Sequence, residues 1–195
     1  NQGGDLLNRI TLIRRQIAID LGLVVPPIRI RDNIQLHPSS YVFKIKGSEF
    51  AQYEILPDHF LAMVTDSVTS KISGIEVEEP AFGLPAIWIQ SSQRERAEMA
   101  GYTVVDPSTV IATHLTEVIR KNAQEILGRQ ELQQLLDNVK QNYPLILEEV
   151  VPNVVNHSAL LKIMQNLLKE SVSIRHMVNI LESLADCKGI NEIDT

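Results

Sequence analysis

Residues 101–115, GYTVVDPSTVIATHL, separate a part of the chain that alternates strands and helices from a part that is helical. Within this stretch, the short apolar run Tyr102–Val105 predicts a strand. Asp106 followed by Pro107 is a typical helix start, because aspartate caps a helix N-terminus and proline suits the first helical position. The helix that begins there is expected to end near Gly128.

Upstream of this stretch, the sequence predicts a helix followed by a hairpin. Apolar residues recur at helical spacing over 6–21, and Gly22 is a suitable stop for that helix. Residues 28–31 alternate apolar and charged side chains, which predicts a strand. Residues 41–45 and 50–56 alternate in the same way and flank a tight turn, so they predict the two strands of a hairpin.

The next part of the chain, up to Gly101, predicts a second small α/β unit. Residues 60–64 and 86–89 are short apolar runs that are typical of strands. The polar stretch 65–74 contains several serines and threonines and predicts a surface loop. Ser92–Glu95 matches a capping box, which predicts a short helix that ends at Gly101.

After Gly128, every periodic segment is helical. Pro144 and Pro152 separate short amphipathic stretches, and Ser173 is expected to cap the last helix. The sequence therefore predicts an α+β fold, with two small mixed α/β subdomains followed by a small helical subdomain.

The composition is that of an ordinary globular protein, and it disfavours several classes of function. Of the 195 residues, 44% are hydrophobic and 22% are charged, and the formal net charge is -6. Such a chain is unsuited to nucleic acid or to anionic lipid, because both require clustered lysine and arginine. The single cysteine, Cys187, excludes an internal disulfide and indicates a reducing compartment.

No stretch of the sequence is long enough to predict a membrane span. The longest apolar run, Leu21–Val25, is stopped by Pro26 and is far shorter than the roughly 20 residues that a spanning helix needs. The chain starts at Asn1 without a methionine and shows no signal peptide. We therefore expect a fragment of a longer protein, whose membrane segments would lie outside this sequence.

The residue patterns of enzymes are absent from the sequence or scattered along it. There is no glycine-rich phosphate loop and no Gly-x-Ser-x-Gly motif. No two of the five histidines have the spacing of metal ligands on a helix. Glu76, Glu78 and Glu79 could bind a cation, but a solvated acidic edge is favoured, and a DNA-reading helix after Ser173 is disfavoured by its balanced charges. We expect no catalytic residue, no cofactor and no metal, and therefore a protein that is not an enzyme.

The segment Pro80–Pro85, PAFGLP, has the most unusual composition. Its two prolines flank Phe82 and Leu84 and restrict the conformations of the loop. A stiff apolar loop either packs on its own domain or forms a surface for binding another protein. Composition alone favours packing in the core and leaves the binding surface open.

Several longer strings occur together in the sequence. They are VPPIRIRDN at 25–33, EPAFGLPAIWI at 79–89, GYTVVD at 101–106, VIATHL at 110–115 and LGRQE at 127–131. In order and spacing, these strings resemble the large cytosolic domain of the flagellar export-gate family and of its virulence type III secretion relatives. The resemblance covers essentially the whole chain, and none of the strings is a generic cofactor motif.

The resemblance implies a particular division of the chain. The first subdomain would be split over 1–57 and 107–126, the second would be inserted as 58–106, and the helical third would be 127–195. A fourth subdomain and an N-terminal transmembrane region would be absent from this chain. The family also implies a cytoplasmic domain of a bacterial inner membrane protein, which docks export chaperone–cargo complexes and hands cargo to the export channel.

Further partners follow from the same resemblance. They are the export ATPase apparatus, other export-gate subunits and, in the full-length protein, copies of the chain in a ring of nine. No nucleic acid is expected, and the membrane would be reached only through the absent N-terminal region.

The family's chaperone-docking surface, a cleft between the first two subdomains, falls on Glu79, Phe82 and Thr113 in this sequence. Phe82 would be an apolar anchor, and Glu79 a charged contact that affects salt dependence and association rate. Some relatives have aspartate where this chain has Glu79, so the position of that charge differs. The alternative function is a small-molecule or nucleotide-binding regulatory α/β domain.

Overall fold

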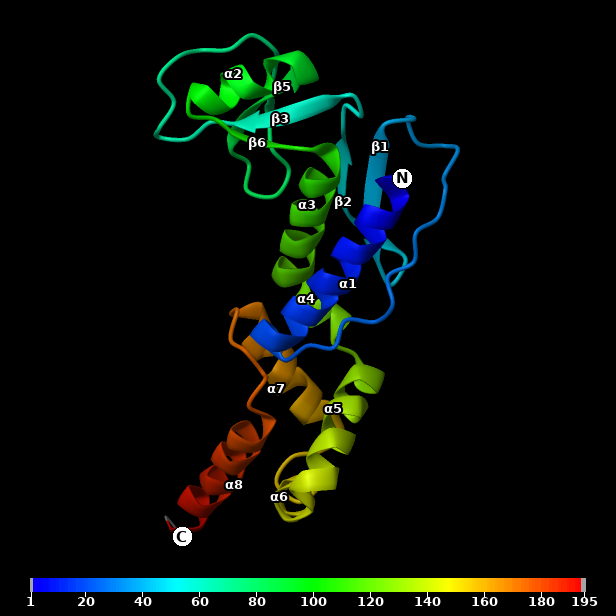
Figure 1. The fold of residues 1–195 in the computed structure, drawn as a ribbon. Coiled ribbons are helices and arrows are strands. Elements are labelled where there is room, and N and C mark those ends of the chain that lie inside the picture. Colours follow the sequence, from blue (N-terminus) through cyan, green and yellow to red (C-terminus); the bar gives the residue numbers. More distant parts are fainter. Residues whose placement is uncertain (1, 194–195) are drawn as a thin grey trace. The chain divides into compact units, whose positions relative to one another are not determined.

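The computed structural model of the chain describes residues 2–193, with side chains described for 5–187. It divides into two compact units. The first unit comprises Ile28–Ile119 and the beginning of the first helix up to Ile13, and the second comprises Arg14–Pro27 and the chain from Arg120 onward. The predicted α+β class is confirmed, since the helices accompany one two-stranded and one four-stranded sheet (Figure 1).

The hairpin of the first unit is confirmed. Strands β1 (Ser40–Ile45) and β2 (Ser48–Glu54) pair antiparallel. Lys46 and Gly47 join them with φ values of 51° and 87°. Two positive φ values in a two-residue loop are typical of a turn whose twist matches that of the strands, and Gly47 adopts this conformation without steric cost.

The larger sheet of the first unit contains four antiparallel strands in the order β4-β5-β3-β6. These strands are β3 (His59–Met63), β4 (Ile75–Glu78), β5 (Pro85–Gln90) and β6 (Thr103–Val105). Strand β4 was not among the predicted strands, because three of its four residues are exposed and two are glutamates. A short, exposed edge strand buries few apolar side chains, so its sequence gives little indication of a strand.

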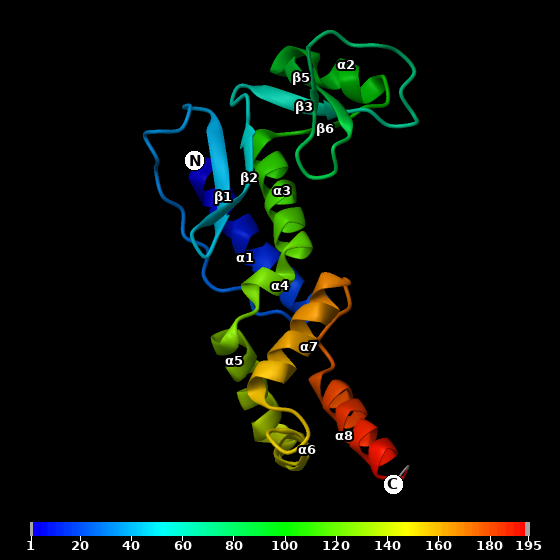
Figure 2. The same ribbon diagram turned by 180° about the vertical axis from the view of Figure 1, so that it is seen from behind.

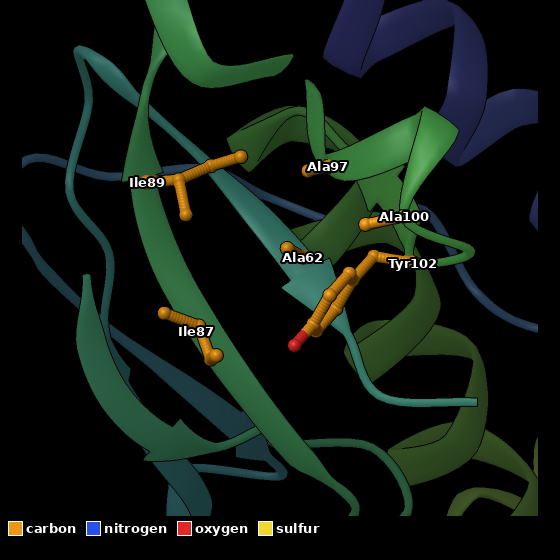
Figure 3. Close-up of a cluster of buried hydrophobic side chains, with 6 residues drawn as sticks. All are labelled: Ala62, Ile87, Ile89, Ala97, Ala100 and Tyr102. Atoms are coloured by element: carbon orange, nitrogen blue, oxygen red, sulfur yellow. The ribbon is translucent and has the colours of Figure 1, made fainter. Parts of the chain in front are cut away.

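Strand β5 is buried on both of its faces, and successive side chains point to opposite faces. On one face, apolar residues of the sheet pack against α2 (Arg94–Met99) and Tyr102 (Figure 3). The members of this cluster are Ala62, Ile87, Ile89, Ala97, Ala100 and Tyr102. On the other face, Ala86 and Trp88 pack with Leu61 and with Val110 of the helix that follows the sheet.

That helix, α3 (Pro107–Lys121), starts as predicted. The carboxylate of Asp106 accepts a hydrogen bond from the Thr109 N–H at 2.7 Å, which caps the first turn. The helix ends earlier than predicted, because the backbone leaves helical geometry at Asn122 and a separate short helix, α4 (Ala123–Ile126), follows.

The second unit contains the predicted series of helices. They are α5 (Arg129–Asn142), α6 (Pro144–Val150), α7 (His157–Lys169) and α8 (Met177–Ile193). The prediction that Ser173 caps the last helix is wrong, because α8 begins four residues later. Residues 173–176 instead run past the end of α1 (Gln2–Leu21), where the Ile174 N–H donates to the Leu21 carbonyl at 2.8 Å.

The predicted strand at 28–31 is also wrong. Within the described residues, this segment belongs to neither sheet. Ile30 is exposed together with Arg29 and Arg31, so the alternating pattern does not bury an apolar face. Among the helices of residues 2–193, none is both long enough and apolar enough to cross a membrane.

Gly22 ends α1 with φ +74°, as expected for a glycine stop. A Cβ atom at this position would overlap the backbone of Ile174 and Arg175. Gly22 is therefore needed for two reasons, its left-handed conformation and the close approach of another chain segment.

We expect Gly22→Ala to destabilise the protein much more than Gly47→Ala. Both glycines have positive φ, which costs an alanine about 1–2 kcal/mol, but only Gly22 is closely covered by backbone. The overlap adds about 1–3 kcal/mol at Gly22. Urea unfolding, together with hydrogen exchange of the Ile174 amide, measures the difference. Equal destabilisation of the two variants would show that the close approach is energetically unimportant.

Candidate protein-docking site

The three predicted docking residues all lie in the first unit. Glu79 directly follows β4, Phe82 lies in the loop that joins β4 to β5, and Thr113 lies on α3. The loop of residues 80–84, called the docking loop below, continues into the central strand β5. Its position is therefore set by a strand that is buried on both faces.

Glu79 is not part of a solvated acidic edge. Its side chain is only 4% exposed, so that expectation is wrong for Glu79, whereas Glu76 and Glu78 are exposed as predicted. The Glu79 carboxylate accepts hydrogen bonds from the Ala81 N–H at 2.9 Å and the Phe82 N–H at 2.5 Å. Burial of the carboxylate is therefore compensated by backbone donors.

Three further hydrogen bonds close the docking loop on the same residue. The Leu84 N–H donates to the Glu79 carboxylate at 3.4 Å, and the Gly83 N–H donates to the Glu79 carbonyl at 3.0 Å. The Glu79 N–H in turn donates to the Leu84 carbonyl at 2.9 Å. Gly83 has φ +70°, which allows the chain to turn back toward β5.

Phe82 is 56% exposed and Leu84 is 48% exposed. The interpretation that this segment packs in the core, which composition favoured, is therefore wrong for both side chains. Only Ala81 of the loop is fully buried. The alternative that the sequence left open, an apolar surface on a stiff loop, agrees with these exposed fractions.

The β1–β2 hairpin lies beside α3 (Figure 2), and an aromatic cluster around His114 joins the two. His114 is buried, and its Nδ1 shares a hydrogen bond with the Tyr41 hydroxyl at 2.8 Å. The rings of Tyr41, Phe43 and Tyr53 lie with their centroids 5.7, 5.2 and 6.3 Å from that of His114. The alternation over 41–45 implies that Tyr41 and Phe43 share one strand face, but no local pattern connects them to His114, which lies far away in the sequence.

This aromatic cluster lies beside Glu79. The Tyr53 hydroxyl donates to the Glu78 carbonyl at 2.9 Å, which ties β2 to the end of β4. Burial raises the pKa of Tyr41 and Tyr53, and the negative charge of Glu79 raises both further. The bond from Tyr53 to Glu78 brings the hairpin next to the residue that precedes Glu79.

Thr113 is half-buried and lies three residues after Val110, which packs on the sheet. Residues three apart lie on the same side of a helix, so Thr113 also faces toward the sheet side of α3. Among the contacts of the described residues, no hydrogen bond joins Thr113 to Glu79 or Phe82. The structure thus connects Glu79 and Phe82 directly and leaves Thr113 a separate member of the predicted site.

Within the described residues, no group of three or more His, Cys, Asp or Glu side chains could hold a metal ion. Cys187 is exposed and His176 is exposed, and neither belongs to the docking loop.

The profile of the FHIPEP family matches residues 1–195. The chain is 54% identical over 186 residues to the flagellar biosynthesis protein FlhA of Bacillus subtilis, covering 95% of this chain and 28% of that protein. It is 50% identical over 185 residues to FlhA of Treponema pallidum, covering 95% of this chain and 26% of that protein. The chain thus spans about a quarter of the length of these relatives.

Solved structures have the same fold. The Chlamydia pneumoniae CdsV protein matches with a TM-score of 0.78 and 27% identity over 91% of this chain and 51% of that one. CdsV has also been solved in complex with CdsO, with the same TM-score of 0.78 and identity of 27%, over 91% of this chain and 55% of that one. The nonameric SctV-C of EPEC is 20% identical with a TM-score of 0.68, over 93% of this chain and 55% of that one, and supports the fold alone.

The raised pKa values of Tyr41 and Tyr53 predict a loss of stability at alkaline pH. Below the ordinary pKa of 10.0, both hydroxyls are neutral in the folded and unfolded chain. Above it, the unfolded chain releases these protons first, so the free energy of unfolding falls as pH rises. We expect the free energy of unfolding of Tyr41→Phe to fall less than that of the parent between about pH 9 and pH 11. Urea unfolding at each pH measures this difference.

Tyr143→Phe is the control for this experiment, because Tyr143 is 56% exposed and lies outside the aromatic cluster. It should leave the pH dependence unchanged. A Tyr41→Phe variant that lost stability with pH as steeply as the parent would contradict the prediction.

Proposed function

The chain belongs to the FHIPEP family of flagellar and type III export-gate proteins, and on that premise we propose that it is a docking platform for export chaperone–cargo complexes. In this role the chain binds the complex and passes its cargo toward the export channel. Glu79, Phe82 and Thr113 form the docking site. The proposed role is protein binding without catalysis.

The exposure of Phe82 and Leu84 on the docking loop is the observation that carries this proposal. Apolar side chains that project from a fixed loop are suited to a partner's apolar groove or pocket, because burying them releases water. The backbone of the loop is already hydrogen-bonded around Glu79, so little ordering is required on binding.

We propose the following division of the platform. Residues 1–57 and 107–126 form the first subdomain, 58–106 form an inserted second subdomain, and 127–195 form the third. Strands β3 to β6 all fall within 58–106 and pair with one another in a single sheet, which supports the insertion. The docking loop then belongs to the inserted subdomain, and Thr113 to the first.

The remaining partners are proposed from the relatives. CdsV forms a complex with CdsO, and SctV-C forms a nonamer. From its membership of the export-gate family, we propose that the whole protein assembles as a ring of nine and contacts the export ATPase apparatus and other export-gate subunits. It would be held at the bacterial inner membrane by an N-terminal region, with this domain in the cytoplasm.

We expect Phe82→Ala to weaken binding of a cognate export chaperone with its bound cargo by roughly thirtyfold. Truncating a central anchor costs on the order of 2 kcal/mol, and about 1.4 kcal/mol corresponds to tenfold in affinity. Because Phe82 is 56% exposed, the variant should remain folded. Isothermal titration calorimetry measures the affinity, and circular dichroism checks the fold.

Met99→Ala is the matched control, since Met99 is 87% exposed on α2 of the same unit but lies outside the docking loop. It should bind as well as the parent, and Thr113→Val should weaken binding less than Phe82→Ala. A folded Phe82→Ala protein with unchanged affinity would refute the docking site. A thermal shift caused by a nucleotide but not by the chaperone complex would favour the alternative function.

A further inference from the structure

We propose that Glu79 is a positioning residue of the docking loop, and that the partner does not pair with its charge. The buried carboxylate holds the backbone in the one conformation that presents Phe82 and Leu84 together to solvent. This inference rests on the proposed function, because it assigns the role of one residue within that docking site. It replaces the expectation that Glu79 is a charged contact.

The hydrogen bonds of the docking loop converge on Glu79. Pro80 has no N–H, and the N–H groups of the next four residues all donate to Glu79. Three of them reach the carboxylate, and that of Gly83 reaches the main-chain carbonyl. A single residue therefore satisfies every main-chain donor of the loop.

The same geometry leaves little of the carboxylate for a partner. Glu79 is 4% exposed, and a carboxylate has about four acceptor positions, three of which are taken by loop N–H groups. Hydrogen bonds to an ionised acceptor are stronger than those between neutral groups. Glu79 is therefore well suited to fix the backbone and poorly placed to meet an approaching charge.

Fixing the backbone has a direct consequence for the exposed side chains. Phe82 and Leu84 are separated only by Gly83, whose φ of +70° reverses the chain between them. Without the hydrogen bonds to Glu79, the docking loop would be free to turn its apolar side chains inward, because burying apolar surface away from water is favourable. The structure assigns Leu84 as the second apolar contact, next to Phe82, for an aliphatic or aromatic segment of the partner.

The decisive variant is Glu79→Gln, compared with Glu78→Gln. Both remove one negative charge, but Glu78 is exposed, whereas Glu79 is buried. The glutamine at position 79 keeps one acceptor oxygen and places an N–H donor against the loop N–H groups. We expect Glu79→Gln to weaken binding of the chaperone–cargo complex about tenfold, and Glu78→Gln to change it less than about twofold.

Salt dependence separates a positioning residue from a charged contact. A charged contact would lose its effect as salt screens it, so Glu79→Gln would matter at low salt and much less at high salt. Replacing a positioning residue weakens binding by the same factor at low salt and at high salt. We therefore expect parallel plots of affinity against salt for the parent and Glu79→Gln, and converging plots would overturn the proposal.

Hydrogen exchange tests the same idea without any partner. The Phe82 and Leu84 amides should exchange at least about tenfold faster in Glu79→Gln than in the parent or in Glu78→Gln, since their acceptor is weakened. Unchanged exchange would overturn the positioning role. This measurement is independent of the docking proposal, which Phe82→Ala tests separately.

Two further variants keep the test informative if Glu79→Gln folds poorly. Glu79→Asp retains the charge and can still reach the nearest loop amides, so it should restore most of the affinity. Gly83→Ala leaves Glu79 untouched but strains the left-handed turn, where a Cβ would meet open space. Gly83→Ala should weaken binding with no change in salt dependence, whereas unaltered affinity would show that loop conformation does not control docking.

Discussion

The burial of strand β5 on both faces is the constraint on which the first unit depends. Ile87 and Ile89 face the cluster that contains α2, while Ala86 and Trp88 face the cluster that contains Val110 of α3. Successive side chains of a strand point to opposite faces, so four consecutive buried residues require a layer on each face of the sheet. Strand β5 is also paired with a neighbouring strand on each side. The docking loop enters this strand directly, so a strand buried on both faces positions two exposed apolar residues, Phe82 and Leu84.

Local chemistry explains which elements could be predicted from the sequence. The glycine stop at Gly22, the Asp106-Pro107 helix start and the β1–β2 hairpin each depend on residues close together in the chain, and each is observed. The strand expected at 28–31 and the cap expected at Ser173 fail for a different reason. Their conformations depend on a pairing partner or on contact with the end of α1, and no local pattern encodes either.

The docking site shows the same limit. The resemblance supplied the positions Glu79, Phe82 and Thr113, but composition favoured a buried Phe82 and a solvated Glu79, and the structure reverses both. Burial of a carboxylate is predictable only when its donors are known, and here the donors are main-chain N–H groups that carry no sequence signature. Their arrangement depends on the proline-flanked turn and on Gly83, which together bring four N–H groups toward one residue, three of them to its side chain.

The bond between Ile174 and Leu21 also constrains the order of events during synthesis. The chain emerges from the ribosome with its N-terminus first, and domains generally fold as they become complete. All strands of the first unit lie before residue 106, so its sheets can pair early. The end of α1 belongs to the second unit and reaches its final neighbour only when Ile174 has been made. The second unit therefore closes late, around a segment synthesised near the beginning of the chain.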